Sequence, residues 1–311
     1  MKVYRSVEAF EKGNNTIATI GTFDGVHIGH QTILNRIIQL AKRVEGESVL
    51  ISFYPHPRLV LFPENNPLKL LHTLEERIAT LEKLGLDKLL LIPFTKEFSR
   101  TPSKAFIRDV LVEGVGIHTI VIGYDHHFGK NRTGGIEELR SFSNQYEYEV
   151  EEIPAQSINE ANISSTKIRR ALESGEVDVA NTYLGYNYGF SGTVVHGEKQ
   201  GRKLGYPTAN MEPEEKTKLI PCHGIYLVKV FAEGQEYFGL MNIGNKPTMG
   251  EFEQSQEVFI MDFSGDLYDK TIRVEFLRYL RGEKKFNSLD ELIAAMNQDK
   301  ANALEIIKTL S

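Results

Sequence analysis

Two histidines stand three residues apart in a glycine-rich segment near the start of the chain. They are His27 and His30, within GTFDGVHIGH at residues 21–30. Residues three apart on a helix share a face, so both imidazoles can donate to the same phosphate group. The glycines at positions 21, 25 and 29 match neither a dinucleotide-binding fingerprint nor a P-loop, and a zinc site would need further ligands. The segment therefore predicts a polyphosphate site at a helix N-terminus, with a plain structural helix start as the alternative.

Three further segments carry side chains suited to anionic ligands: ISSTKIRRAL (163–172), GYDHHFGKNRTGG (123–135) and FYPHPR (53–58). The first places hydroxyl residues at a helix start, followed by basic residues that include Arg169. In the second, Asp125 can hold a ligand hydroxyl or ring edge, and basic residues can meet phosphate. Each segment alone also fits a capped helix or a solvated loop. Their coincidence at predicted strand ends and a helix start favours one ligand site.

The segment GTVVHGEKQGRKLGYPTAN, residues 192–210, combines spaced glycines with an excess of positive charge. Such a loop can fold over phosphates. Pro207 then leads into a stretch where strand alternation puts the Thr208 hydroxyl and the Asn210 amide on the same side. Both are hard oxygen ligands of the type that magnesium accepts. On local evidence, a basic hairpin turn followed by a capping threonine is an equally good interpretation.

Alternating strands and helices must position the first set of residues. Short β-rich apolar runs at 16–23, 48–54, 87–94, 118–123 and 148–155 are separated by segments with helical periodicity. Thr73 and Glu76 have the spacing of a capping box, Gly85 ends that helix, and Ser103 begins another. This alternation predicts an α/β fold with a doubly wound, mostly parallel sheet, whose ligands lie outside the carboxyl ends of the strands.

After two short helical stretches the pattern changes near residue 186. Closely spaced strands follow without crossover helices, and one amphipathic helix begins at Ser288. This pattern predicts an antiparallel β-barrel or sandwich with a terminal helix packed on it. A length of 311 residues favours two domains, which we place at 1–185 and 186–311.

Composition excludes several classes of protein. The net charge of −6 is shared about evenly by the two halves, so neither half is a basic nucleic-acid arm. The longest apolar stretches fall far short of the roughly 18 residues that a membrane span needs. The N-terminus lacks a secretory apolar segment, and the single cysteine, Cys222, has no disulfide partner within the chain. We expect a cytoplasmic protein that acts on small molecules without nucleic acid or membrane; the oligomeric state stays open.

The first half resembles a known enzyme module. GTFDGVHIGHQ, FYPHP, GYDHHFGKNRTGG and ISSTKIR, in this order, resemble the adenylyltransferase module of prokaryotic bifunctional riboflavin kinase/FMN adenylyltransferases, also called FAD synthetases, over roughly residues 1–185. The resemblance implies that the FMN phosphate attacks the α-phosphorus of ATP and releases pyrophosphate. One departure is His126-His127, where the family often has an aromatic and a basic residue.

The same resemblance implies roles for particular residues of this module. His27 and His30 would flank the ATP phosphates, and Arg169 with its hydroxyl neighbours would clamp them. The implied nucleotide-binding residues are Gly21, Phe23, Asp24, Gly29, His56, Ser165 and Thr166, and the implied flavin-binding residues are Asp125 and Phe128.

The second half is similar to the riboflavin kinase module over about residues 186–311, through GRKLGYPTAN, MNIGNKPT, QEVFIMDFSGDLYD and LRGEKKFNSLDEL. The resemblance implies transfer of the γ-phosphoryl group of ATP to the ribityl 5′-hydroxyl of riboflavin. Thr208 and Asn210 would hold Mg²⁺, Glu257 would be the catalytic base, and Phe259 stands where the family commonly has His. The remaining implied contacts are nucleotide binding by Gly192, Gly201, Lys203, Gly205 and Pro207, and flavin binding by Asn242.

Together the two halves imply an enzyme that makes FMN in its second domain and FAD in its first. An alternative is a flavin- or nucleotide-binding regulator that has lost one or both activities. Retention of Glu257 argues against a regulator, because a sensor needs no base. A truncated aminoacyl-tRNA synthetase would explain HIGH at residues 27–30, but the sequence has no KMSKS and that class leaves PTAN unexplained.

Overall fold

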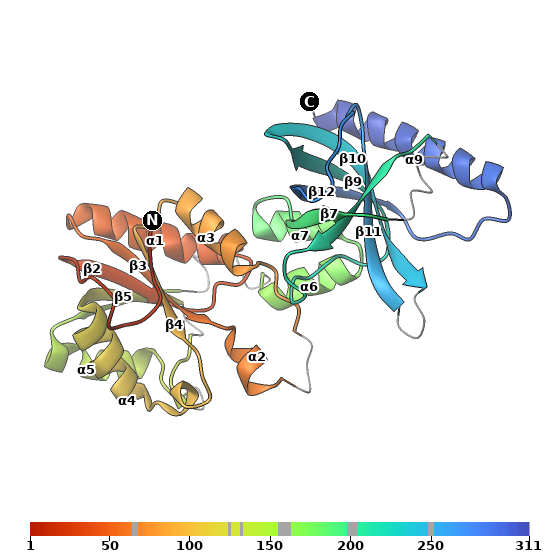
Figure 1. Ribbon diagram of the computed structural model, residues 1–311. Coiled ribbons are helices and arrows are strands. Elements are labelled where there is room, and N and C mark those ends of the chain that lie inside the picture. The colour runs from red at the N-terminus through yellow and green to blue at the C-terminus, as the bar shows by residue number, and fades with distance from the viewer. Residues whose placement is uncertain are drawn as a thin grey trace. The chain divides into compact units, whose positions relative to one another are not determined.

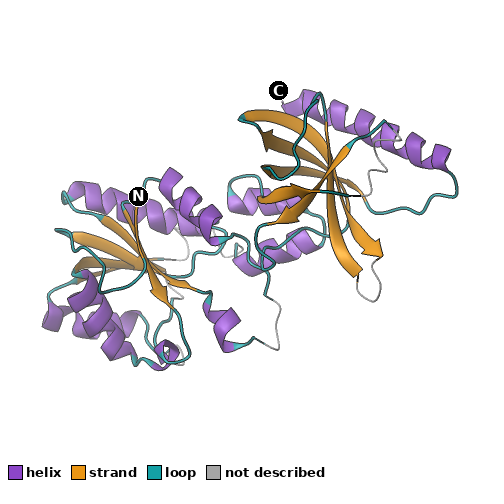
Figure 2. Cartoon of the chain, viewed as in Figure 1, coloured by secondary structure: helices purple, strands orange, loops and turns teal. Residues whose placement is uncertain are grey.

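A computed structural model describes residues 1–63, 68–123, 126–130, 133–154, 163–197, 205–247 and 252–310. It divides into two compact units, Met1–Ser165 and Thr166–Ser311. Figures 1 and 2 show an α/β first unit and a β-rich second unit. Both predicted fold classes are therefore confirmed.

The first unit is built on a parallel six-stranded sheet with the order β1-β4-β3-β2-β5-β6. Every neighbouring pair is parallel, as the alternation of strands and helices predicts. The strands are β1 (Lys2–Tyr4), β2 (Thr16–Ile20), β3 (Ser48–Tyr54), β4 (Lys88–Pro93), β5 (Ile117–Gly123) and β6 (Glu149–Ile153).

Helices cover both faces of this sheet (Figure 1). They are α1 (Ile28–Arg43), α2 (Pro57–Leu61), α3 (Leu74–Lys83), η1 (Phe98–Arg100), α4 (Ser103–Ala105), the π-helical η2 (Phe106–Val115) and α5 (Ile136–Tyr146). Leu34 and Leu81 pack in a core on one face, from α1 and α3. Leu111 and Leu139 pack in the core on the other face, from η2 and α5. The sheet is thus buried on both sides, which accounts for its nearly continuous apolar strands.

Three predicted helix signals are confirmed. The Thr73 side chain accepts from the Glu76 backbone N–H, and the Glu76 carboxylate accepts from the Thr73 N–H, which completes the capping box of α3. Gly85 follows with a φ of +85°, a left-handed conformation that glycine adopts without steric cost. The helix predicted from Ser103 is present as α4 and η2, and it ends at left-handed Gly116.

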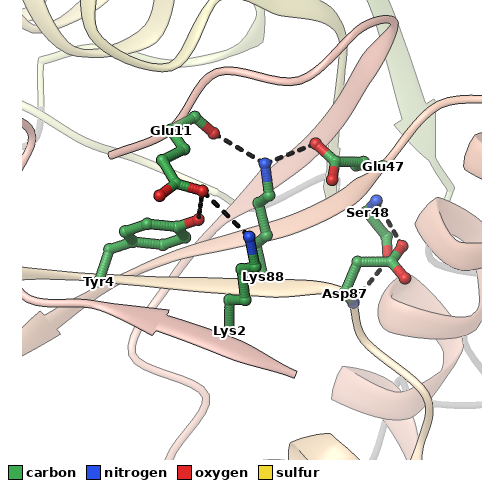
Figure 3. Close-up of polar contacts among 7 residues, drawn as sticks. All are labelled: Lys2, Tyr4, Glu11, Glu47, Ser48, Asp87 and Lys88. Atoms are coloured by element: carbon green, nitrogen blue, oxygen red, sulfur yellow. Dashed lines mark hydrogen bonds and ion pairs between the residues drawn. The ribbon is translucent and has the colours of Figure 1, made fainter. Parts of the chain in front are cut away.

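The short edge strand β1 is absent from the sequence-based expectation. It pairs with β4 through Lys2 and Lys88. Lys88 is buried at the start of β4, where its Nζ donates to the Glu11 carbonyl at 2.7 Å and the Glu47 carboxylate at 2.6 Å (Figure 3). Lys2 and Tyr4 contact the Glu11 side chain. These contacts between distant segments secure a strand of only three residues.

The second unit is a closed barrel with the strand order β10-β11-β8-β7-β12-β9, and every pair of neighbours is antiparallel. The barrel alternative was right, and the sandwich alternative was not. Its elements are α6 (Ser165–Glu173), α7 (Val177–Leu184), β7 (Gly189–Val195), β8 (Thr208–Pro213), β9 (Gly224–Ala232), β10 (Gln235–Pro247), β11 (Phe252–Ile260), β12 (Thr271–Arg281) and the terminal helix α9 (Leu289–Leu310).

The helices α6 and α7 pack on the barrel. Asn181 of α7 donates to the Phe276 carbonyl of β12 at 2.8 Å and accepts from the Tyr188 N–H at 2.7 Å. The Cys222 N–H donates to the Leu172 carbonyl of α6. Packing therefore divides the chain at 165/166, earlier than the change of sequence pattern at 185/186. Within the described ranges, no helix is long and apolar enough to cross a membrane.

Candidate active sites

The first candidate site lies at the switch point of the parallel sheet, which is the place where neighbouring strands are followed by crossovers to opposite sides. β2 has β3 on one side and β5 on the other, so the crossovers that leave these central strands diverge. In such sheets the crevice outside the carboxyl ends of the strands binds ligands. The loop at residues 21–27 follows β2 at this point, and His126 and His127 come after the end of β5. The predicted location of the first site therefore coincides with the switch point.

The backbone of the loop at residues 21–27 is strained. Phe23 has a φ of +48° and Val26 a φ of +37°, although neither is glycine, and both are buried. Such conformations cost about 1–3 kcal/mol each and persist only where surrounding contacts hold them. A Cβ on Gly21 would lie 2.6 Å from the Phe23 ring, which explains the glycine there. The loop thus has one tightly specified shape.

His27 and His30 come together at the start of α1, as their spacing predicts. His27 is the N-cap residue, and its Nδ1 accepts the His30 backbone N–H at 3.4 Å. A neutral His27 therefore carries its proton on Nε2. The two rings stack with centroids 3.6 Å apart, and the Phe23 ring lies 4.5 Å from that of His30. The stack fixes both imidazoles at one helix N-terminus.

The environment of His30 disfavours its protonated form. Burial is the main cause, and the neighbouring His27 and His72 add to it, so the pKa of His30 lies well below the ordinary 6.5. Its Nδ1 is buried and has no hydrogen-bond partner among the described residues. At neutral pH, His30 is therefore a neutral imidazole, which can meet a phosphate as a hydrogen-bond donor.

Asp24 ties the loop to the segment before α3. Its carboxylate accepts the Leu71 N–H at 3.1 Å and the His72 N–H at 3.1 Å. The Asp24 carbonyl accepts the Ser165 hydroxyl at 3.0 Å, so the structure brings together these two predicted residues. Thr166 and Arg169 belong to the second compact unit.

The other predicted residues of the first site have varied surroundings. Gly29 is buried in α1, and His56 caps α2 by accepting the Arg58 N–H at 3.2 Å. Phe128 is buried, with its ring centroid 5.6 Å from that of Phe106, which leaves little of its surface for a ligand. Asp125 lies outside the described residues.

An open cavity of about 620 Å³ lies beyond the end of β5. Its lining includes His126 and His127, the two residues that depart from the family pattern, together with Ser103 and Glu138. Ser103 donates to the Glu138 carboxylate at 2.8 Å. The two residues that differ from the family pattern therefore line the wall of a cavity beside the switch point.

The second candidate site forms a row across three strands of the barrel. Glu257 of β11 is paired with Asn242 of β10 on one side and with Asn210 of β8 on the other. The Thr208 hydroxyl donates to the Glu257 carboxylate at 3.2 Å. Directly paired residues point to the same face of a sheet. Strand pairing thus gathers the predicted base, both predicted magnesium ligands and the predicted flavin-binding asparagine.

This row lies on the outer face of the barrel. Met241 and Val258, which alternate with the row, are fully buried. Leu240 and Phe259, the next residues on the same face, pack in a cluster with Ala303 of α9. Phe259 therefore contributes an apolar contact at the position where the family commonly has His.

Two described glycines of the segment 192–210 approach β8 closely. A Cβ on Gly197 would lie 2.2 Å from the Asn210 side chain, and one on Gly192 would lie 2.6 Å from the Glu212 carbonyl. Gly205 has a φ of +80° in open space, and Pro207 is exposed before β8. Gly201 and Lys203 lie outside the described residues.

Sequence reasoning missed Arg77 as a residue of the first site. Arg77 is buried on α3 between Leu74 and Leu81, and it contacts the loop through the Thr22 carbonyl. Leu74, Arg77 and Leu81 have the spacing of a core-facing helical stripe. The sequence did carry a signal for Arg77, because a charged residue stands at a position of this stripe where an apolar residue is expected.

Comparisons with known proteins agree with both halves of this description. The FAD synthetase family model matches residues 9–167, and the riboflavin kinase model matches residues 184–307. The bifunctional riboflavin kinase/FMN adenylyltransferase of Pseudomonas fluorescens is 38% identical over 92% of this chain and 91% of its own. That of Bacillus subtilis is 33% identical over 96% and 95%.

A solved structure from Streptococcus pneumoniae, described as a macrolide-efflux protein, has a TM-score of 0.86 and 29% identity over 96% of this chain and 97% of its own. The likeness extends through both units. The fold and the two sites thus define a two-domain transferase, with a nucleotidyltransferase unit followed by a kinase barrel.

The chain belongs to the family of bifunctional riboflavin kinase/FMN adenylyltransferases. It is an enzyme with both activities, in the order in which the two family models match. The comparisons lend no support to the alternative of a binding protein that has lost turnover.

Proposed function

We propose that the first unit transfers the adenylyl group of ATP to FMN at the loop of residues 21–27 and the start of α1. The observation that carries this assignment is the stack of His27 on His30 at a helix N-terminus. The FMN phosphate is already ionised at neutral pH, so its attack on the α-phosphorus needs no general base. Catalysis then rests on positioning and on stabilising charge at the transferring and leaving phosphates. His27 and His30 would do this as N–H donors, whereas Ser165, Thr166 and Arg169 stay predictions from the sequence motif.

In the barrel, we propose that Glu257 accepts the proton of the riboflavin 5′-hydroxyl as that oxygen attacks the γ-phosphorus of ATP. The bond from the γ-phosphorus to the bridging oxygen breaks, and ADP leaves. A neutral hydroxyl gains from a positioned carboxylate, unlike the phosphate nucleophile of the first reaction. The pairing of Glu257 with Asn210 and Asn242 supports this role, because it sets the proposed base between the proposed metal ligand and the proposed flavin contact.

Thr208 and Asn210 suit a magnesium ion. Their hydroxyl and amide oxygens are hard ligands, and the Thr208 hydroxyl already contacts the Glu257 carboxylate. When bound, Mg²⁺ neutralises charge on the ATP phosphates. The two side chains would orient it beside Glu257, on the outer face of the barrel.

The remaining predicted contacts complete the two sites. Gly21, Phe23, Asp24, Gly29 and His56 would shape the first nucleotide site, with Asp125 toward the flavin, whereas the burial of Phe128 speaks against its predicted flavin contact. Gly192, Gly201, Lys203, Gly205 and Pro207 would serve the second nucleotide site, with Asn242 toward the flavin. Substrates of this kind and a single cysteine support a cytoplasmic enzyme that needs no nucleic acid or membrane.

The test separates the two activities in one chain. We expect Glu257→Ala to lower FMN formation from riboflavin about a hundredfold or more while FMN adenylylation continues, and His30→Ala to do the reverse. Flavins are separated by chromatography after incubation with ATP and magnesium, with either riboflavin or FMN as substrate.

Matched controls come from the same units. Glu236→Ala removes an exposed carboxylate of the barrel that pairs with Lys229, and His118→Ala removes an exposed histidine of β5. Both should retain both activities. Loss of both activities in a folded Glu257→Ala protein would contradict the two-site assignment.

A further inference from the structure

Arg77 places a positive charge directly behind the strained loop of residues 21–27. Its side chain is buried, and Nη1 donates to the Thr22 carbonyl at 2.6 Å and to the Ser52 hydroxyl at 3.3 Å. Ser52 belongs to β3. Arg77 therefore connects the loop to the neighbouring strand of the sheet.

A second tie holds the same loop from the same side. The Asp24 carboxylate accepts N–H groups of Leu71 and His72, which directly precede the N-cap Thr73 of α3. The Arg77 N–H donates to the Thr73 carbonyl at 3.1 Å, as part of the first turn of α3. Both ties thus start from one rigid helix end, which the capping box specifies.

The two ties bracket the strained residue Phe23. Arg77 binds the residue before it, and Asp24 is the residue after it. The left-handed Phe23 carries its ring against His30. A change in the conformation of Phe23 would therefore alter the packing of His30 and, through the ring stack, of His27.

We propose that Arg77 is a positioning residue for adenylyl transfer. It holds the Thr22 carbonyl, and with the Asp24 tie it keeps Phe23, His27 and His30 in the arrangement that meets the ATP phosphates. This inference rests on the proposed function of His27 and His30.

The test compares Arg77→Met, which removes the charge and the donors, with Arg77→Lys, which keeps the charge on a single nitrogen. We expect Arg77→Met to lower kcat for FMN adenylylation about tenfold to a hundredfold, with the KM for FMN and the kinase activity of the same molecules nearly unchanged. Arg77→Lys should recover part of the lost kcat. Rates are measured well below the unfolding temperature and per folded molecule.

The matched control is Arg36→Gln. Arg36 lies on α1 and forms a bidentate pair with Glu151 at 2.5 and 2.8 Å, so its replacement also breaks an arginine contact of the first unit. We expect kcat near the wild-type value. A merely structural role for Arg77 predicts instead that Arg77→Met and Arg36→Gln have equal kcat per folded molecule, which would overturn the proposal.

If Arg77→Met does not fold, Arg77→Lys decides by amide hydrogen exchange of residues 22–27. The proposal expects faster exchange together with a several-fold lower kcat; wild-type exchange and wild-type kcat would overturn it. The variant His30→Ala distinguishes a failure of the Arg77 proposal from a failure of the proposed function of His27 and His30. Full adenylylation by His30→Ala contradicts the proposed function, whereas its loss beside a fully active Arg77→Met contradicts only the role of Arg77.

Discussion

His30 has a buried Nδ1 with no hydrogen-bond partner among the described residues, and burial together with the neighbouring His27 and His72 disfavours its protonated form. A neutral imidazole still carries one N–H, which can donate a hydrogen bond to a phosphate oxygen where charge develops on leaving pyrophosphate. The barrel uses a different residue chemistry. There the proposed base, Glu257, is a carboxylate beside the Thr208 hydroxyl and is paired with Asn210 and Asn242; a carboxylate can accept the proton of a neutral hydroxyl nucleophile.

The lowered pKa of His30 predicts how stability depends on pH. Between that lowered pKa and the ordinary 6.5, the unfolded chain binds a proton that the folded chain does not. The contribution of His30 is therefore complete above pH 6.5 and is lost as the pH falls below it, by up to about 1.4 kcal/mol per pH unit. Urea unfolding between pH 5 and 7 should show this dependence in the wild type and a weaker one in His30→Gln. Parallel curves for the two proteins would contradict it.

Among the elements, α3 links local sequence to the site most directly. Its capping box specifies where the helix begins, and this start places Arg77 one turn later against the Thr22 carbonyl. The β3–β4 crossover thus supports the loop that follows β2. In the barrel, strands take the place of such a helix. The pairing of β8, β11 and β10 sets the side chains of Asn210, Glu257 and Asn242 side by side.

Removing the cap should weaken this element. We expect Thr73→Ala to lower the free energy of unfolding of the first unit by about 1 kcal/mol, since the Glu76 N–H loses its acceptor. Thr73→Ser keeps the hydroxyl and should remain close to the wild type. The measurement is urea denaturation. Equal midpoints for Thr73→Ala and Thr73→Ser would contradict the prediction, because the capping hydroxyl would then contribute nothing to the free energy of unfolding.

At the scale of the whole molecule, each compact unit has its own apolar core; the loop with His27 and His30 belongs to the first unit, and the row with Glu257 belongs to the second. The cores on the two faces of the parallel sheet contain residues of the first unit alone, and the cluster under α9 contains residues of the barrel unit alone. We therefore expect the two activities to fail independently when one core is damaged.

Large-to-small substitutions test this expectation. Leu50 of β3 and Ile272 of β12 are both buried, and replacing either by Ala should cost its own unit about 2–5 kcal/mol. On heating, Leu50→Ala should lose FMN adenylylation at a lower temperature than the wild type and keep the wild-type profile of riboflavin phosphorylation. Ile272→Ala should do the opposite. Equal shifts of both activities in either variant would mean that the units unfold as one.

The sequence by itself determined the alternation of strands and helices, the capping box at Thr73 and the loop that carries His27 and His30. These features depend on periodicity, caps and turns within short segments. It also supplied Thr208, Asn210 and Glu257 as candidates, through their motifs.

Only the tertiary structure decided how distant residues meet. The pairing of Glu257 with Asn210 and Asn242 depends on the register of three strands, which the burial of one barrel face sets. The contact of Arg77 with the loop depends on a helix that follows a different strand, and β1 depends on pairing with β4. Such contacts arise from packing between segments far apart in the chain, for which local periodicity carries no signal.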